Sequence, residues 1–548
     1  MNPKTATQEA IKQPAKISQN GTHSNGGGKE PVNALARAVV LHMNGDLQGA
    51  LKALESAEQD GGANAEILAA RGYVQMDLND FDGAAKSYGA LVSVQSGDAE
   101  AWFQWGYCLQ KLSRPADALE KFQQSVRLGS NWIETPLAIG ICHLSLKQYK
   151  DAITALDQCL VKDARYRPAI YTKAVALHLT WSFDEAAKLY EKVLEAEPAS
   201  EETLLNLISL GLQQKNFPLL ERYSKRLLEL KPDAPEGLEG LAVCAFSRGE
   251  FDVAAGHYQT LAKLIPTEVE YWLNLGISYH RQSMLREAVP AFTNARDLRP
   301  DSTYVQTYLG FALWQTGDLA GARSCFQTAL SQSPDRDDIV LHLASVMEEQ
   351  HAEPEAAQVC VLFLETKPDV AEVWFRLGYL RLTLKEFAGA IEAFDKCLQL
   401  QPGWPEAELN LALACFQGRQ APRAQKVLET MLKREPDNAE VTKGLATIAL
   451  ESGDNNRAFT LHQRLIELGA ATPEIYYNCG LLAQQSGNAQ KAAEFYRKAI
   501  EEREDFPEAL LNLGHVLNSE GREEEARACW APALELKPEL ALGYFRKG

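Results

Sequence analysis

The sequence predicts an all-α protein built as an α-solenoid of about fifteen 34-residue helix-turn-helix repeats. Two ladders of small residues carry this prediction. Steps of 34 residues from Ala38 to Gly548 meet glycine or alanine at every position except Ile208. Twelve residues further on, the same step from Ala50 to Ala526 meets alanine at all but one position. So strict a period, without insertions, indicates stacked units that bury their apolar surface against their neighbours.

Each repeat is predicted to form two helices. Between Ala371 and Leu384 the apolar residues recur three or four positions apart, which is typical of an amphipathic helix. A second run of this period extends from Ala390 to Leu400 and stops before Pro402, since proline cannot continue a helix. Nine repeats end in proline at this phase: Pro198, Pro232, Pro266, Pro300, Pro334, Pro368, Pro402, Pro436 and Pro538. Four first helices are expected to begin at a proline, which needs no N–H there: Pro235, Pro405, Pro473 and Pro507.

The composition argues against several classes of protein. The 548-residue chain carries 55 Lys+Arg against 73 Asp+Glu, a net charge of −18. General nucleic-acid binders are basic, so we expect no nucleic-acid partner. No apolar run reaches the roughly 20 residues that span a bilayer, and the polar residues 1–30 hold no secretory signal. We therefore expect a cytoplasmic protein without membrane insertion.

The sequence contains no motif for catalysis, cofactor binding or metal coordination. The ten cysteines include no C-x-x-C pair and no Cys/His cluster with zinc spacing. Phosphate-loop, dinucleotide-binding, nucleophile-elbow and H-E-x-x-H patterns are also absent. We therefore expect a protein that is not an enzyme, that uses no cofactor, and whose cysteines are small core residues.

Three regions are predicted along the chain. Residues 1–31 are polar, contain three consecutive glycines and lack aromatic side chains, which indicates a disordered tail. Residues 32–538 form the array of fifteen repeats. Residues 539–548 are expected to begin a sixteenth repeat or a capping helix, although Leu540 and Leu542 lack the polar character of a usual cap. We expect that the native chain is longer or that this C-terminal end self-associates.

One repeat departs from the pattern at three positions. Ile208 replaces a small residue on its first helix, while Leu220 and Ser224 replace an alanine and an aromatic residue on its second helix. The larger side chains are expected to push the two helices apart. Because repeats couple mainly to their neighbours, local opening is expected to begin there.

One repeat reproduces a known pattern in full, with its residues at the expected offsets: Trp272, Leu275, Gly276, Tyr279, Ala288, Phe292, Ala295 and Pro300. It resembles the tetratricopeptide repeat, and the long array resembles the repeat domain of O-GlcNAc transferase-like proteins. The resemblance implies a right-handed superhelix of antiparallel helix pairs. It also implies a concave groove lined by the first helices and a role in binding proteins. The fold alone does not imply a particular partner.

The resemblance places the groove at the second, fifth, sixth, ninth, twelfth and thirteenth positions of each repeat, here called groove positions. The sixth position carries asparagine in five repeats: Asn206, Asn274, Asn410, Asn478 and Asn512. An asparagine amide both donates and accepts, so it can pair with the backbone of an extended peptide. The alternative is that asparagine is simply common at this phase.

Aromatic and basic residues also occupy groove positions in the middle of the array, namely Tyr308, Phe311, Trp314, Phe375, Arg376 and Tyr379, with Asn274, His280 and Arg281 just before them. Aromatic residues and arginine are enriched at interface hot spots. We expect Trp314 to receive an apolar side chain and Arg376 to pair with a ligand carboxylate. Replacing either residue with alanine should weaken binding roughly thirtyfold. The alternative is that some of these rings cover neighbouring helices.

These features predict a non-catalytic scaffold that binds an extended peptide or a partner protein in the groove. Two alternatives stay open. The chain is the repeat half of a larger enzyme, such as an O-GlcNAc transferase-like glycosyltransferase, or it is a scaffold of a secretion or pilus assembly.

Overall fold

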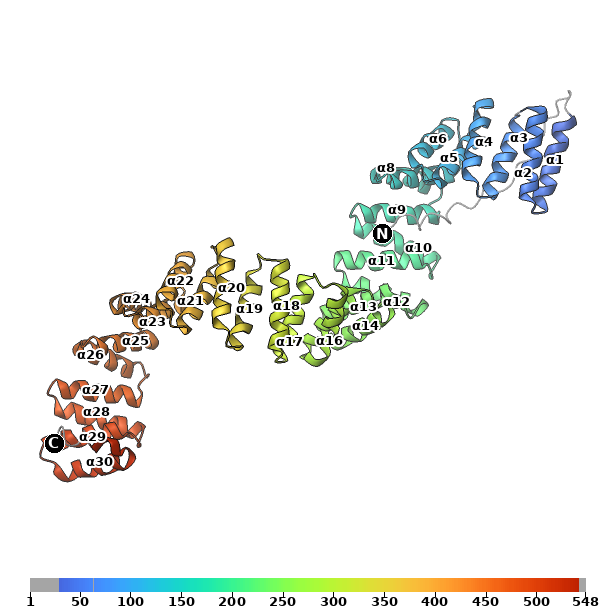
Figure 1. Cartoon of the computed structure of the whole chain (residues 1–548). Coiled ribbons are helices and arrows are strands. Elements are labelled where there is room, and N and C mark those ends of the chain that lie inside the picture. The colour runs from blue at the N-terminus through green and yellow to red at the C-terminus, as the bar shows by residue number, and fades with distance from the viewer. Residues whose placement is uncertain (1–28, 63, 542–548) are drawn as a thin grey trace. The chain divides into compact units, whose positions relative to one another are not determined.

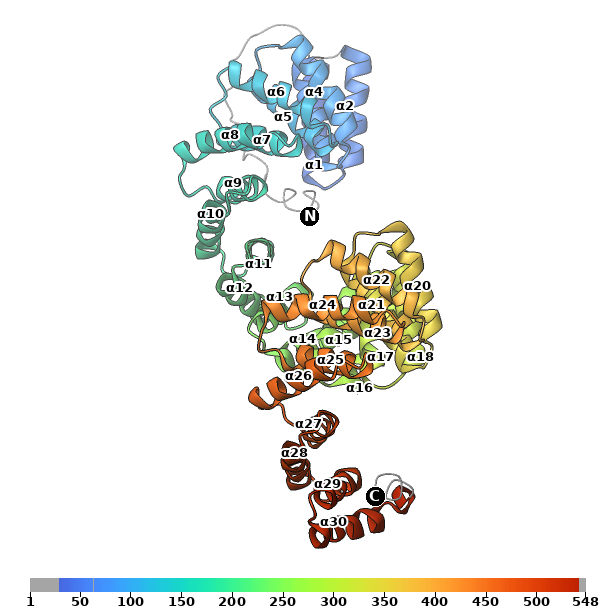
Figure 2. The same cartoon turned by 90° about the vertical axis from the view of Figure 1, so that its left-hand side faces the viewer.

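The computed structural model describes residues 29–62 and 64–541, and within them it contains thirty α-helices and one 3-10 turn. They form two compact units, an N-terminal unit (residues 1–282) and a C-terminal unit (residues 283–548). Inside each unit every helix packs against the next one along the chain (Figures 1 and 2). This confirms the all-α solenoid of paired helices that the 34-residue period predicts.

The N-terminal unit contains α1 (Lys29–Met43), α2 (Leu47–Gly61), α3 (Ala65–Asp77), α4 (Phe81–Val94), α5 (Ala99–Lys111), α6 (Pro115–Arg127), α7 (Glu134–Ser145), α8 (Tyr149–Lys162), α9 (Arg167–Leu179), α10 (Phe183–Ala196), α11 (Glu201–Gln214), α12 (Phe217–Leu230), α13 (Pro235–Ser247), α14 (Phe251–Leu264) and α15 (Val269–Arg281).

The C-terminal unit contains α16 (Leu285–Leu298), α17 (Thr303–Gln315), α18 (Leu319–Gln332), α19 (Asp337–Glu349), α20 (Glu353–Thr366), α21 (Ala371–Thr383), α22 (Phe387–Leu400), α23 (Pro405–Gln417), α24 (Ala421–Arg434), α25 (Ala439–Glu451), α26 (Asn455–Glu467), α27 (Pro473–Gln485), α28 (Ala489–Glu502), α29 (Pro507–Ser519), α30 (Glu523–Leu536) and the 3-10 turn η1 (Pro538–Leu540).

Local sequence signals set the ends of these helices. The four prolines expected to open first helices do begin α13, α23, α27 and α29. Between the two helices of a repeat, one residue adopts a left-handed conformation, for example Gly317 with φ of 86°. The next residue caps the second helix: the Asp318 carboxylate accepts a hydrogen bond from the backbone N–H of Gly321 at 2.9 Å. This cap satisfies an N–H that the helix itself leaves unpaired.

The small-residue ladder makes room for an aromatic ring of the same repeat. A Cβ atom added at Gly378 would lie 2.7 Å from the Phe394 ring, and one at Gly106 would lie 2.8 Å from the Phe122 ring. Both rings are fully buried. Phe394 also packs in one core with Leu411 and Leu428 of the next repeat.

The helix pair that carries Ile208 is closely packed, so its larger side chains do not push the two helices apart as expected. The local opening expected there stays a prediction. Ile208 is 2% exposed, and Leu220 is completely buried. A different glycine provides the close approach, since a Cβ added at Gly211 would lie 3.0 Å from the Leu220 Cα atom. The aromatic ring is displaced by one residue to Tyr223, which is 1% exposed. Compensating substitutions therefore restore the packing.

The ends of the array differ slightly from the predicted boundaries. Helix α1 begins at Lys29, within the predicted tail, because its first turn tolerates Pro31. The rest of that tail lies outside the described residues. At the other end α30 continues through Pro532, and Leu540 packs against the core that contains Trp530. Most of the predicted segment 539–548 lies outside the described residues.

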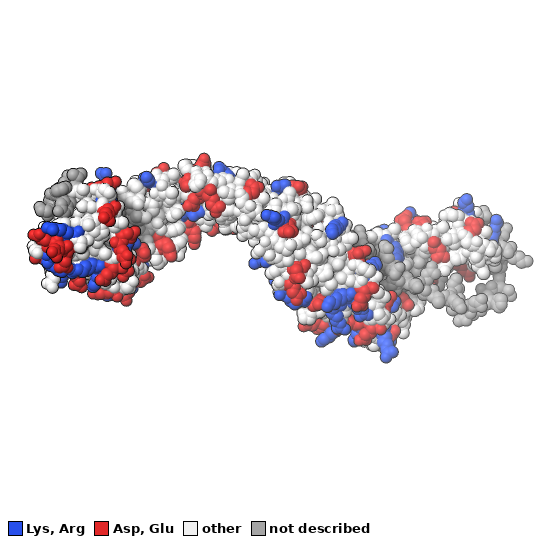
Figure 3. Space-filling view, turned by 90° about the horizontal axis from the view of Figure 1, so that it is seen from below, with Lys and Arg blue, Asp and Glu red and all other residues white. Residues whose placement is uncertain are grey.

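The surface is charged but mixed. On the face in Figure 3, basic side chains are interspersed with acidic ones and form no continuous basic area. None of the described helices combines the length and apolar composition needed to cross a bilayer.

Candidate partner-binding site

A small apolar pocket opens between four helices of the N-terminal unit. It has a volume of about 160 Å³ and is lined by Phe217 of α12, Val243, Phe246 and Ser247 of α13, Tyr258 of α14 and Asn274 of α15. Four of these six residues occupy groove positions, since Val243, Phe246 and Ser247 are ninth, twelfth and thirteenth in their repeat and Asn274 is sixth in the next. This volume suits one aliphatic side chain. We call it the Asn274 pocket.

Polar groups lie at the Asn274 pocket and near it. The Ser247 hydroxyl donates a hydrogen bond to the Cys244 carbonyl at 2.7 Å. Glu239, one turn before Val243 on α13, is half-buried. Burial, and then the neighbouring Glu236 charge, raise the pKa of the Glu239 carboxyl. Glu239 also lies close enough to Tyr258 to contribute to the raised pKa of that phenol, whose main cause is burial.

Sequence analysis placed only Asn274 of this site among its candidates. The other lining residues at groove positions were visible in the 34-residue register. A single valine or phenylalanine in that register gives no signal for a ligand contact, because such residues are more often found in the core. Phe217 and Tyr258 come from second helices, so the groove register gives no signal for them.

In the C-terminal unit, the predicted aromatic residues pack mainly on one another. The Phe311 ring lies edge-on to His342, with 4.5 Å between ring centroids, and stacks beside Trp314 at 6.5 Å. Tyr308 stacks on the buried Phe292 ring at 5.8 Å. All three predicted rings are half-buried. His342, at the sixth position of the next repeat, completes this cluster.

Phe375, a second predicted groove aromatic, covers neighbouring helices instead of lining an open groove. Phe375 stacks on Trp404 with 4.7 Å between centroids and meets Phe394 edge-on at 5.9 Å. Its ring therefore joins α21 to the helices around it. Tyr379 is different, because it is 38% exposed and stays accessible to a partner.

Arg376 is already paired inside the protein. Its guanidinium lies 3.0 Å from the Glu348 carboxylate and also donates a hydrogen bond to the Ser345 hydroxyl. A ligand carboxylate at this position would have to displace Glu348. The arginine thus joins α21 to α19 in the structure, and its use for ligand binding stays a prediction.

Most of the groove asparagines bond within the chain. The Asn206 amide donates to the Tyr171 hydroxyl at 2.9 Å, and Asn512 donates to the Tyr477 hydroxyl at 3.0 Å. Asn512 is only 7% exposed. Both tyrosines lie 35 residues earlier, at the fifth position of the preceding repeat.

The remaining candidates differ in their surroundings. Asn410 donates to the Glu406 carbonyl of its own helix at 2.8 Å, and Asn478 lies 3.3 Å from the His462 ring. His280 and Arg281 lie in the last turn of α15, where His280 is half-buried and Arg281 is exposed. Asn274 differs from these candidates in that it lines the apolar pocket described above.

The His462–Asn478 contact predicts a pH dependence of stability. His462 is 4% exposed, and its Nδ1–H donates to the Ala458 carbonyl at 2.7 Å. That bond leaves Nε2 to accept from the Asn478 amide. Burial lowers the pKa of His462 below its usual 6.5. The unfolded chain therefore takes up a proton first, and stability is expected to fall as the pH drops below about 6.5.

Thermal unfolding between about pH 7.5 and pH 5 measures this effect. We expect His462→Gln to show a smaller fall in midpoint than the parent. The exposed His351, replaced in the same way, is the matched control and should behave like the parent. An equal pH dependence in all three proteins would contradict the prediction.

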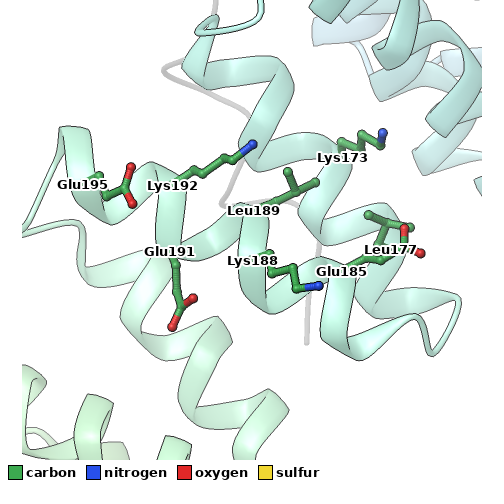
Figure 4. Close-up of a pocket in the computed structure, with 8 residues that line it drawn as sticks. All are labelled: Lys173, Leu177, Glu185, Lys188, Leu189, Glu191, Lys192 and Glu195. Carbon is green, nitrogen blue, oxygen red and sulfur yellow. The ribbon is translucent and has the colours of Figure 1, made fainter.

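A larger surface pocket between α9 and α10 has a volume of about 420 Å³ (Figure 4). Its charged lining residues are Lys173, Glu185, Lys188, Glu191, Lys192 and Glu195, with Leu177 and Leu189. Lys173 pairs with Asp157 at 2.5 Å, and Glu191 accepts a hydrogen bond from Tyr223 at 2.6 Å. The equal numbers of both charges favour no ligand class.

The described residues give no support to a reactive centre. No group of three or more histidine, cysteine, aspartate or glutamate side chains within them could hold a metal ion. All ten cysteines are free and nine are buried. Burial raises the pKa of the Cys142 and Cys360 thiols to about 12, so neither forms the thiolate needed for reaction.

Comparisons with known protein families match most of the array. Models described as tetratricopeptide repeat match residues 220–269, 273–337, 309–364 and 483–542. The tetratricopeptide-repeat domain of cytochrome c-type biogenesis protein H matches residues 362–476. The chain is a tetratricopeptide-repeat protein. A model of subunit 3 of the anaphase-promoting complex also matches residues 77–159 of this repeat protein.

Similar curated proteins are distant. Superkiller protein 3 of Schizosaccharomyces pombe is 22% identical over 45% of this repeat protein and 19% of its own length. The BBSome complex member BBS4 of Bos taurus is 23% identical over 42% of this chain and 45% of its own. Protein O-mannosyl-transferase TMTC3 of Homo sapiens is 21% identical over 47% of this chain and 29% of its own. The chain spans less than half the length of these relatives.

Proposed function

We propose that this chain is a non-catalytic scaffold that binds an extended peptide of a partner protein, with the Asn274 pocket as the anchor point. The observation that carries the proposal is the pocket itself. It is an apolar cavity built mainly from groove positions, with an amide at its wall. An apolar ligand side chain would fill the cavity, and the Asn274 amide would pair with the peptide backbone whatever the peptide sequence.

Relatives of this kind support a role in protein assemblies. BBS4 is a member of the BBSome complex, and a model of an anaphase-promoting complex subunit matches part of this chain. Both belong to multi-protein complexes. In such a role, the repeats position other proteins.

Selection of peptides by the full chain tests the proposal. The immobilised protein selects from a phage library of random nonapeptides, and the best peptide is synthesised for binding measurements. Replacing Phe246 with alanine is expected to weaken binding roughly thirtyfold because it removes the pocket wall. Replacing Asn274 with alanine should weaken binding about fivefold through one lost hydrogen bond.

The matched control is Asn410→Ala, because Asn410 also holds a sixth position but bonds to its own helix. This variant should bind like the parent, and circular dichroism should show the same helix content in all variants. Failure to select any peptide, or equal binding by all variants, would overturn the proposal.

One alternative has a specific observation in its favour. TMTC3 is named as a transferase, and its match covers only 29% of that protein. The chain would then be the repeat part of a larger glycosyltransferase. A coding sequence that continues past Gly548 into a catalytic domain would support this alternative, and a stop codon there would count against it.

A further inference from the structure

The charges around the Asn274 pocket are mainly of one sign. The pKa of the Tyr271 phenol is raised to about 12, mainly by burial. Four glutamates of α13 and the start of α15 are close enough to contribute: Glu239, Glu268, Glu236 and Glu270. Two basic side chains of this region are paired within the chain: Arg248 pairs with Glu221 and Glu250, and Lys225 pairs with Glu221. Of these carboxylates, Glu236 and Glu239 lie on α13, the helix that supplies three residues of the pocket lining, and they offer a negative charge to a ligand cation.

Glu239 is the carboxylate best placed to meet that cation. It is half-buried, and within the described residues it makes no ion pair or side-chain hydrogen bond. Partial burial makes its ionised form costly, and a ligand cation would offset that cost. A charge-assisted hydrogen bond to such a carboxylate is also stronger than one between neutral groups.

The spacing between Glu239 and the pocket defines the ligand further. Glu239 and Val243 are four residues apart on α13, so their side chains lie one above the other, about 5–6 Å apart at Cβ. In an extended peptide, side chains two residues apart point to the same side and are separated by about 6.6 Å. An apolar residue in the pocket and a basic residue two positions away therefore match the helix spacing.

We infer that the Asn274 pocket recognises a basic peptide in which an apolar side chain enters the cavity and a lysine or arginine two positions away pairs with Glu239. This inference rests on the proposed function and names the partner class. It differs from the expectation at Arg376, which called for an acidic ligand, because Arg376 is paired with Glu348 whereas Glu239 is not paired within the described part of the chain.

A double-mutant cycle on the full chain tests the pairing. The peptide selected by the parent protein is made again with glutamine in place of its basic residue, and both peptides are measured against the parent and Glu239→Gln. We expect the basic residue to improve binding about tenfold in the parent and by less than twofold in Glu239→Gln. The control Glu372→Gln changes an exposed glutamate at the second position of α21 and should behave like the parent.

The possible results separate the two proposals. Selected peptides without a basic residue, or an equal loss on both proteins when it is replaced, would overturn this inference and leave the proposed function standing. If no peptide is selected at all, both the proposed function and this inference fail. Equal thermal unfolding of the parent and Glu239→Gln excludes misfolding as the cause of any loss.

Discussion

Replacing Phe394 with alanine is expected to lower the free energy of unfolding of the surrounding repeats by about 3–5 kcal/mol. The Phe394 ring is fully buried, lies on Gly378 of its own repeat and meets Phe375 edge-on. Its loss removes transfer free energy and leaves a cavity, because the close-packed helices around the ring can collapse only partly into the space. Stability in a solenoid is local, so the effect is expected to concentrate in α21–α23.

Hydrogen exchange measured by mass spectrometry checks this result. Amides of residues 371–417 should exchange much faster in Phe394→Ala than in the parent, while the N-terminal unit should be unchanged. The matched control is Leu400→Ala in the same helix, since Leu400 is 43% exposed and its truncation should change stability little. Equal exchange in both variants would contradict the prediction.

Replacing Gly211 with alanine is expected to destabilise the α11–α12 pair by about 1–3 kcal/mol. Alanine is normally the better helix former by up to about 1 kcal/mol, so propensity alone predicts the opposite sign. The added Cβ would lie 3.0 Å from the Leu220 Cα atom and 3.1 Å from its backbone nitrogen. Backbone atoms cannot rotate away as a side-chain end can, so the helices themselves must separate.

Urea unfolding and hydrogen exchange of residues 201–230 measure the change. The control is Gly256→Ala in α14, where no atom lies within 4 Å of the added Cβ. At Gly256 the higher helix propensity of alanine meets no steric cost, so the free energy of unfolding should rise by about 0.5–1 kcal/mol. The same sign of change at both glycines would show that close approach at Gly211 does not limit stability.

Gly378 and Gly211 show which helix contacts the sequence predicts and which it does not. At Gly378, which belongs to the small-residue ladder, the missing side chain leaves room for the Phe394 ring of the same repeat. Gly211 stands outside both ladders, so the repeat with Ile208 and Leu220 was expected to open. The 34-residue period describes the average repeat. In this repeat the close contact between the two helices moves by three residues, from the position of Ile208 to Gly211, because several side chains differ together.

The candidate site was less readable than the fold. The asparagines at sixth positions were correctly placed in the register, yet the sequence did not show that Tyr171 and Tyr477 engage two of them. Nor did it show that Glu348 engages Arg376. Whether a polar side chain is free depends on its neighbours in adjacent repeats, about 30 residues away, and a motif at one position carries no such information.

The sequence by itself determined the helix pairs, their 34-residue period, the positions where helices begin and end, and the residues that face one another within a repeat. These features follow from local helix propensity and from a hydrophobic periodicity that recurs in every repeat. The tertiary structure alone decided which groove residues meet at a pocket and which are used for packing. A cavity such as the Asn274 pocket is the space left between side chains of four helices, and its existence depends on how all of them pack at once.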